Sequence, residues 1–255
     1  MPSAHFRFYE ELNDFLPPSK RKVEFEQEFA GRPAVKDIIE ALGVPHTEVD
    51  LILIDGKSVD FSTPLVDGAH VSVYPMFEAL DITPLLRVRA RPLRTSRFVL
   101  DAHLGRLARY LRLLGFDAWY RNDYDDRTLA RICQSERRIL LTRDRGLLKR
   151  STVTHGYYVR ETQPLRQARE VLGRFDLYRA ARPFKRCLHC NGLIKEVTKE
   201  EILNRLEPNT HRYFDQFWVC ESCQRIYWQG SHYERMQRLV QALLKNSTSE
   251  RCSTN

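Results

Sequence analysis

The sequence predicts an α/β protein: a parallel sheet covered by helices on both faces, with a smaller mixed domain before it and a cysteine-rich unit after it. Between residues 97 and 183, short apolar strands alternate with amphipathic helices, and such short strand–helix links are typical of parallel sheets. Residues 1–79 combine strands of alternating apolar and polar residues with one helix. Two CxxC pairs fall within residues 184–244.

Residues 1–79 form the first predicted domain. The patterns predict two strands in HFRFYEEL and KVEFEQEF, a helix in RPAVKDIIEALG, a hairpin in VDLILIDGKSVDF and a last strand in AHVSVYP. This order is typical of a β-grasp, or ubiquitin-like, domain. Residues 35–75 resemble the sulfur-carrier branch of that superfamily, whose members end in a free Gly-Gly. Because this chain continues without a diglycine, a binding or scaffolding role is favoured over carrier chemistry.

A basic, proline-bearing linker is predicted over residues 80–96, and a polar, disordered tail over 245–255. The linker arginines are interpreted either as phosphate contacts or as part of a solvated tether. They are Arg87, Arg89, Arg91 and Arg94, with Arg97 just beyond.

The central domain, residues 97–183, is predicted to alternate strand and helix four times. The strands are RFVLD, FDAWY, RRILLT and HGYYVR, and the helices that follow them are HLGRLARYLRLLG, DDRTLARICQSE, RGLLKR and PLRQAREVLGRF. In open parallel sheets of this kind, ligands bind beyond the carboxyl ends of the strands. The residues that follow each strand are therefore the candidates for a site.

Acidic residues follow three of those strands. Asp101 ends the first strand, Asp123, Asp125 and Asp126 follow the second, and Asp144 follows the third. Carboxylates that converge at one sheet edge repel each other unless a cation lies between them. Mg²⁺ or Mn²⁺ prefers such oxygen ligands together with water and phosphate. Helix capping by Asp125, Asp126 and Asp144, and a loop position for Asp123, remain open as alternatives.

The strongest local motif is a pair of CxxC knuckles in the predicted third domain, residues 184–244. Four thiolates at this spacing can close tetrahedrally on a structural Zn²⁺, and the segment FWVCESCQRIYW reads as a hairpin with one knuckle at its turn. Two reduced or redox-active CxxC pairs are the alternative. The predicted ligands are Cys187, Cys190, Cys220 and Cys223.

Other residues of these domains have simpler interpretations. Cys133 lies on an apolar helix face and is predicted to be core, and Cys252 lies in the tail as a free thiol. Trp228 and Tyr233 are interleaved with basic residues, so they are interpreted either as stacking surfaces for unpaired bases or as core of a small unit.

Charge is distributed unevenly along the 255 residues. Residues 1–84 hold 7 Lys and Arg against 15 Asp and Glu, whereas the rest of the chain holds 34 against 18. A basic body of this kind favours a polyanionic partner, although a solvated basic surface is the alternative. No apolar run is long enough to span a membrane, and the N-terminus lacks the pattern of a secretory signal. We therefore expect a cytoplasmic protein without membrane association.

Several segments together resemble the Mut-seven C-terminal RNase family. They are FVLDAHLGRLARYLRLLGFDAWY, DDRTLARICQSERRILLTRDRGLLKR, RCLHCN and YWQGSHYERM, which cover residues 97–240 in the expected order. The resemblance implies a PIN-like nuclease fold joined to a zinc ribbon, and metal-dependent cleavage of RNA. The acidic N-terminal unit is similar to the ubiquitin-like module fused to this family.

The resemblance also implies which residues act. Asp101, Asp126 with Asp125 beside it, and Asp144 of the TRD motif match the family's catalytic aspartates, which would hold one Mg²⁺ or Mn²⁺. PIN-type sites often add an acid soon after the last of these, but Arg145 and Gly146 stand there, so a fourth ligand is missing or comes from Asp125 or Asp123.

The predicted function is therefore hydrolysis of RNA phosphodiesters, with single-stranded RNA as the expected partner. The zinc ribbon is expected to aid RNA binding, and the ubiquitin-like domain to bind a protein partner. A non-catalytic nucleic-acid-binding adaptor with a degraded site is the alternative. Thr142 either orients a carboxylate or the attacking water, or bonds locally. The side chains predicted to hold the RNA backbone are Arg143, Arg145, Lys149 and Arg106.

Overall fold

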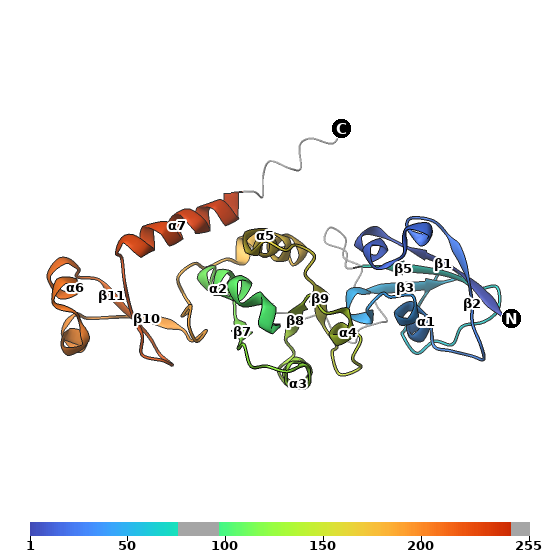
Figure 1. Ribbon diagram of the computed structural model, residues 1–255, viewed down its shortest axis with the longest axis horizontal. Helices are drawn as coiled ribbons and strands as arrows, with labels where there is room; N and C mark the ends of the chain where they lie inside the picture. The colour runs from blue at the N-terminus through green and yellow to red at the C-terminus, as the bar shows by residue number, and fades with distance from the viewer. Residues whose placement is uncertain (76–96, 246–255) are drawn as a thin grey trace. The chain divides into compact units, whose positions relative to one another are not determined.

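The computed structural model describes residues 1–75 and 97–245 (Figure 1). The predicted linker, 80–96, lies outside the described residues, and so does the predicted tail apart from its first residue. The described residues divide into two compact units. Unit 1 contains residues 1–75 and 125–158, and unit 2 contains residues 97–124 and 159–245.

The N-terminal domain is a five-stranded mixed sheet with one helix, α1 (Val35–Ala41). The strand order is β2-β1-β5-β3-β4, with β1 parallel to β5 and every other pair antiparallel. This arrangement confirms the predicted order of elements. The strands are β1 (Ser3–Phe8), β2 (Phe25–Glu28), β3 (Leu51–Ile54), β4 (Lys57–Val59) and β5 (His70–Tyr74).

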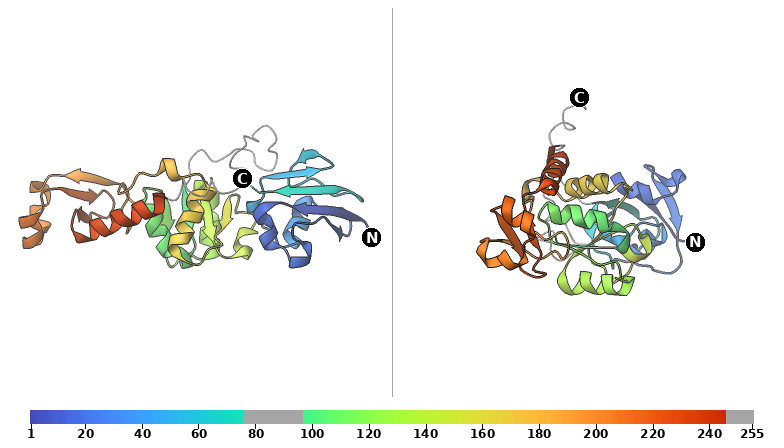
Figure 2. Two further views of the ribbon diagram at one scale, coloured as in Figure 1. Left: turned by 90° about the horizontal axis from the view of Figure 1, so that it is seen from above. Right: turned by 60° about the vertical axis from the view of Figure 1, so that its left-hand side comes forward.

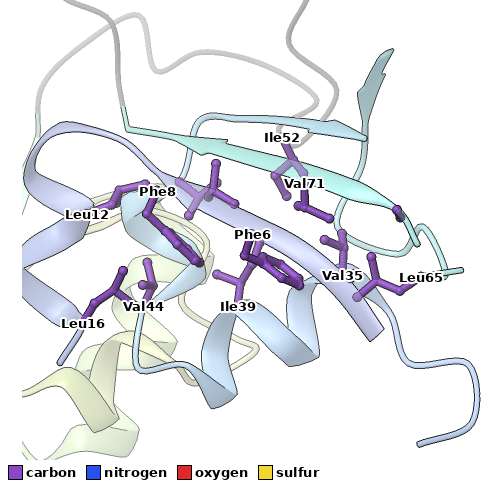
Figure 3. Close-up of a cluster of buried hydrophobic side chains, with 14 of the residues drawn as sticks. Phe6, Phe8, Leu12, Leu16, Val35, Ile39, Val44, Ile52, Leu65 and Val71 are labelled. Atoms are coloured by element: carbon purple, nitrogen blue, oxygen red, sulfur yellow. The ribbon is translucent and has the colours of Figure 1, made fainter. Parts of the chain in front are cut away.

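The core of this domain follows from the two-residue period of β1. Phe6 and Phe8 point to one face of the sheet, where Val35 and Ile39 of α1 cover them (Figure 3). The β3–β4 hairpin turns at Asp55, with φ of 49°, and Gly56, with φ of 76°. Positive φ at both central residues is what a tight two-residue hairpin requires, and Asp-Gly supplies it at low cost.

The second sheet has four strands in the order β7-β6-β8-β9, and its registered pairs, β6 with β7 and β8 with β9, are parallel. Every residue of β6 and β8 is buried, as expected for strands covered on both faces. The strands are β6 (Phe98–Leu100), β7 (Ala118–Tyr120), β8 (Ile139–Thr142) and β9 (Gly156–Tyr158).

Helices alternate with these strands as the sequence predicts. In unit 2, α2 packs against both α5 and β7, and α2 and α5 lie side by side (Figures 1 and 2). Within the described residues, no helix has the length and apolar character needed to cross a membrane. The helices are α2 (Gly105–Leu113), α3 (Asp126–Glu136), α4 (Arg145–Leu148) and α5 (Pro164–Arg174).

Gly115 ends α2 in the left-handed region, with φ of +92°. An added Cβ would lie 2.1 Å from the Arg182 carbonyl oxygen. The chain after α5 therefore approaches the end of α2 so closely that only glycine fits there.

The predicted third domain, which lies within unit 2, is a three-stranded antiparallel sheet in the order β10-β11-β12, followed by α7 (Ser231–Leu244). Its small core contains Ile202, Phe217 and Val219. The hairpin predicted in FWVCESCQRIYW is confirmed, because β11 and β12 flank the second CxxC pair. The remaining elements are β10 (Ile194–Val197), β11 (Phe217–Cys220), β12 (Ile226–Trp228) and α6 (Pro208–Tyr213).

Candidate functional site: a four-cysteine centre and three aspartates

The four knuckle cysteines come together in one group, which we call the four-cysteine cluster. Their Sγ atoms all lie within 4.8 Å of one another. The Cys187–Cys223 Sγ atoms are 3.6 Å apart and the Cys190–Cys220 Sγ atoms 3.4 Å. A tetrahedral Zn²⁺ with Zn–S bonds of about 2.3 Å requires sulfurs about 3.8 Å apart, so this donor set fits zinc. With four thiolates the coordination shell is closed, as in structural zinc sites.

Hydrogen bonds prepare one of these thiols for ionisation. Burial opposes ionisation of Cys187, but the Tyr227 hydroxyl, 3.0 Å from the sulfur, and nearby backbone N–H groups outweigh it and lower its pKa to about 6. Burial raises the pKa of Cys190 to about 12, and its neighbouring thiols add to the increase. Burial raises the pKa of Tyr227, and the neighbouring Cys187 and Cys223 sulfurs raise it further.

A buried arginine joins the first knuckle to α2 and β7. The Arg112 guanidinium donates to the Ala118 carbonyl at 2.8 Å and to the knuckle carbonyls of His189 at 2.9 Å and Leu188 at 3.3 Å. Burial lowers the pKa of Arg112, while the Cys187 and Cys190 sulfurs and Asp117 oppose that shift. The knuckle is thus anchored to the central domain by a charged donor.

Asn191 makes a second connection between the first knuckle and β7. Its Oδ1 accepts from the Ala118 N–H at 3.0 Å, and its Nδ2 donates to Asp117 at 2.7 Å. Asn191 has φ of 71°, a conformation that asparagine tolerates better than most residues.

Asp144 begins α4 two residues after the end of β8. Its Oδ1 accepts from the N–H groups of Gly146 at 2.7 Å and Leu147 at 3.3 Å, so it acts as the helix N-cap. The Thr142 hydroxyl accepts from the Asp144 N–H at 3.0 Å, which is the local bonding that the sequence left as one alternative. Asp144 is exposed, and its capping bonds engage only one carboxylate oxygen.

The acids after β7 divide their roles at the start of α3. Asp125 is the N-cap and accepts from the Thr128 N–H at 2.8 Å, which lowers the pKa of Asp125. Asp126, the first helical residue, is released from capping and lies 3.2 Å from the Arg150 guanidinium. Asp123 pairs with Arg121 at 2.7 Å. The sequence left either Asp125 or Asp126 as the N-cap of α3, and in the structure the cap is Asp125.

Asp101 follows β6 directly and is half-buried, at the start of the 3₁₀ turn that leads into α2. It belongs to unit 2, whereas Asp126 and Asp144 belong to unit 1. Each of the three carboxylates therefore lies just after a strand or at the start of a helix, as predicted. That they share one metal ion stays a prediction.

Two of the four basic residues predicted to hold RNA contact the N-terminal domain, and their role in RNA binding stays a prediction. The Arg145 guanidinium lies over the rings of Phe15 at 5.0 Å and Tyr158 at 5.3 Å, and it donates to the Asp14 carbonyl at 3.5 Å. The Lys149 ammonium donates to the Glu40 carbonyl at 2.6 Å. Binding RNA through either side chain would require exchange of these contacts. The other two are Arg106, which is exposed, and Arg143, which is half-buried.

Comparison with known proteins decides the family. Residues 96–240 match the family described as the Mut7-C RNAse domain, and residues 1–81 match the one described as Mut7-C ubiquitin. The chain belongs to the Mut7-C RNAse family. Its RNAse domain therefore contains all three aspartates and the four-cysteine cluster. The resemblance inferred from the sequence motifs is confirmed, as is the ubiquitin-like N-terminal domain.

Among solved structures, the crystal structure of SAMP1 from Haloferax volcanii is 14% identical to this Mut7-C protein, with a TM-score of 0.25. The match covers 30% of this chain and 98% of the other. A search of the curated proteins found no match.

The anchoring residues of the Mut7-C RNAse domain were missed by the motif analysis. Arg112 carried a usable signal, because it stands one helical turn after Ala108, on the apolar face of α2, where a charged residue needs buried partners. Asn191 and Tyr227 carried no such signal, since their roles depend on contacts with Asp117 and Cys187 that only the fold creates.

Proposed function

We propose that this Mut7-C protein is a metal-dependent ribonuclease that hydrolyses phosphodiester bonds of single-stranded RNA. The single observation that carries the proposal is the match to an RNAse family over residues 96–240, a range that contains Asp101, Asp126 and Asp144. Membership in a nuclease family implies nucleic-acid binding. The choice of RNA and the requirement for a metal are what the experiment below tests.

The donor set suits a hard divalent cation. Three carboxylates that follow strand ends offer oxygen ligands, which Mg²⁺ and Mn²⁺ prefer. Asp126 and Asp144 are both accessible to solvent, and Asp144 keeps an oxygen outside its helix cap. A bound Mg²⁺ or Mn²⁺ would supply a Lewis acid for a phosphate oxygen and a water of lowered pKa.

The chain's own residues would position the substrate. We keep all four predicted basic residues, Arg106, Arg143, Arg145 and Lys149, as candidates for the RNA backbone. Arg145 and Lys149 would have to exchange their contacts with the N-terminal domain. The bond from the Asp144 N–H to Thr142 fixes the turn that presents the Asp144 carboxylate. Asp125, as the cap of α3, positions the backbone of Asp126.

The remaining parts would support this activity. We assign Zn²⁺ to the four-cysteine cluster as a structural ion and RNA binding to the ribbon that it holds. The ubiquitin-like domain is a site for a protein partner, since no diglycine ends it. Disulfides are rare in the reducing cytosol, which suits thiolate ligands, so we assign the protein to the cytoplasm.

A second candidate function is a nucleic-acid-binding adaptor without catalysis. Two observations favour it: Asp126 is paired with Arg150, and Arg145 and Gly146 stand where PIN-type sites often carry a further acid. An arginine on a would-be ligand carboxylate competes with a cation for the same oxygens.

The test is cleavage of end-labelled single-stranded RNA by the full-length protein, first freed of divalent ions and then supplied with Mn²⁺ or Mg²⁺. The key variant is Asp144→Asn, because asparagine keeps the helix cap but removes the charge. The matched control is Asp37→Asn, which removes one exposed carboxylate from α1.

We expect cleavage that depends on the metal, is unchanged in Asp37→Asn, and falls at least about 100-fold in Asp144→Asn, the scale of losses when one group that stabilises the transition state is removed. Binding without cleavage by the unsubstituted protein in either metal would favour the adaptor. Equal cleavage by both variants would refute the assigned site. A labelled DNA of the same sequence tests the choice of RNA.

A further inference from the structure

An aromatic cavity lies in unit 2 among the ribbon, α7 and the segment that enters the first knuckle. Its volume is about 250 Å³, slightly below the roughly 300–1,000 Å³ typical of pockets for drug-sized ligands. One ring system fits such a space. We call it the aromatic pocket, and the residues that define it here are Phe184, Lys185, Trp218, Trp228, Tyr233 and Met236.

The aromatic side chains of this pocket do not belong to the buried core of the ribbon. The core of the ribbon contains Ile202, Phe217 and Val219, whereas Trp228 is 39% exposed and Trp218 and Tyr233 are half-buried. Partly exposed aromatic faces around a cavity are the feature of surfaces on which unpaired bases stack. The prediction that Trp228 or Tyr233 stacks on bases therefore gains a specific location.

One wall of the pocket is held rigidly. Phe184 has φ of +62°. This backbone conformation is unfavourable for a large residue and persists only where the surrounding structure imposes it. Its N–H donates to the Leu113 carbonyl at 3.0 Å, at the end of α2. The ring then lies against Tyr233, with centroids 4.8 Å apart and planes 41° from each other. A preorganised wall lowers the entropy lost when a ligand binds.

A second wall is fixed to the four-cysteine cluster. Tyr227 lines the pocket and makes a hydrogen bond with the Cys187 sulfur at 3.0 Å. The pocket and the cluster are therefore parts of one local structure.

The charges around the pocket match a phosphate chain. Both charged residues in its lining, Lys185 and Arg186, are basic. Residues 178–190 also contain Arg179 and Arg182 and no acid. Arg186 is held by carbonyl groups and Asp117, whereas Lys185 is exposed. Aromatic faces beside cations are the composition of sites for single-stranded nucleic acids.

We propose that the aromatic pocket binds one unstacked base of a single-stranded RNA, with the exposed Lys185 available for an adjoining phosphate. This inference rests on the proposed function and deepens it: it names the part of the substrate that the ribbon holds.

The test measures binding to the full-length Asp144→Asn protein without added divalent ions, conditions in which we expect little or no cleavage of the probe. The probes are a fluorescein-labelled decamer of uridine and a labelled decamer of the same length without bases, compared by fluorescence anisotropy. The pocket variants are Trp228→Ala and Tyr233→Leu. The matched control is Tyr213→Ala, an aromatic residue of the ribbon that is 68% exposed and outside the pocket.

We expect each pocket variant to raise the Kd for the uridine decamer about 5- to 150-fold, the range measured for loss of one stacked base, and to leave the Kd for the decamer without bases unchanged within twofold. Tyr213→Ala should match the parent. Equal Kd values for both probes in the parent, or pocket variants that behave like Tyr213→Ala, would overturn the proposal.

A measurement without substitutions guards against misfolded variants. A decamer carrying 5-iodouridine, crosslinked by light, should form adducts at Trp228, Tyr233 or Phe184 by mass spectrometry, and adducts only elsewhere would refute the pocket. Because these assays measure binding, their failure alongside intact RNA cleavage would reject the pocket and keep the ribonuclease. Base-dependent binding by a protein that does not cleave RNA would reject the ribonuclease and keep the pocket.

Discussion

Replacement of Arg112 by methionine should destabilise unit 2 strongly. The guanidinium makes two short hydrogen bonds, to the buried Ala118 carbonyl at 2.8 Å and to the His189 carbonyl at 2.9 Å, and longer ones to Leu188 and Tyr120. Hydrogen bonds from a charged donor contribute about 1.5–3 kcal/mol each, and the carbonyls left behind would be unsatisfied. We therefore expect a loss of about 3–5 kcal/mol in the free energy of unfolding.

Thermal unfolding monitored by tryptophan fluorescence measures this loss. At about 2–4 °C per kcal/mol for a chain of this size, the midpoint should fall by roughly 6–20 °C. Arg109→Met is the control, because Arg109 is an exposed residue of the same helix, and a change there should stay within about 0.5 kcal/mol. If Arg112→Met and Arg109→Met both unfold at the same midpoint as the parent protein, Arg112 does not anchor the knuckle.

Three further predictions concern the same structure. Gly115→Ala should unfold unit 2 or lower its midpoint by more than Arg109→Met does, because the new Cβ would lie 2.1 Å from the Arg182 carbonyl oxygen; a midpoint equal to that of the parent would contradict the close approach. Removal of the ion from the four-cysteine cluster with a strong chelator should abolish amide-exchange protection in β11 and β12, because metal binding and folding are coupled in small zinc units; protection that survives would show that the ribbon folds alone. The last prediction concerns pH. Burial raises the pKa of Glu40, but the hydrogen bond and charge of His46, 2.6 Å away, outweigh it and lower that pKa overall. The stability gained is present above the unfolded value of about 4.3 and is lost as pH falls through the lower folded pKa. Below about pH 4.3, the midpoint of the parent should therefore fall more steeply than that of Glu40→Gln, and parallel curves would reject the pair as a source of stability.

Local patterns predicted the elements and the four-cysteine cluster well. The Asp55-Gly56 turn, the strand ends before Asp101 and Asp144, and the two knuckles are all encoded within a few residues, and the described structure confirms them. Spacing alone predicted the cluster, because each CxxC turn brings two sulfurs together and two such pairs are typical of a zinc site.

Tertiary contacts explain what the sequence did not reveal. Arg145 and Lys149 were predicted to hold RNA, and that stays a prediction. The sequence did not reveal their contacts with Asp14 and Glu40, which lie more than a hundred residues away in the chain. The distinction between Asp125 as cap and Asp126 as the released carboxylate also needs backbone geometry, since either residue is a good N-cap by type.

The central claim is that Asp101, Asp126 and Asp144 hold one hard cation. Anomalous scattering from crystals of the full-length protein grown with Mn²⁺ tests it most directly. The account predicts one peak at the three carboxylates, bound to their oxygens directly at about 2.0–2.6 Å or through bound waters. No peak at these carboxylates, with Asp126 still paired to Arg150, would contradict it.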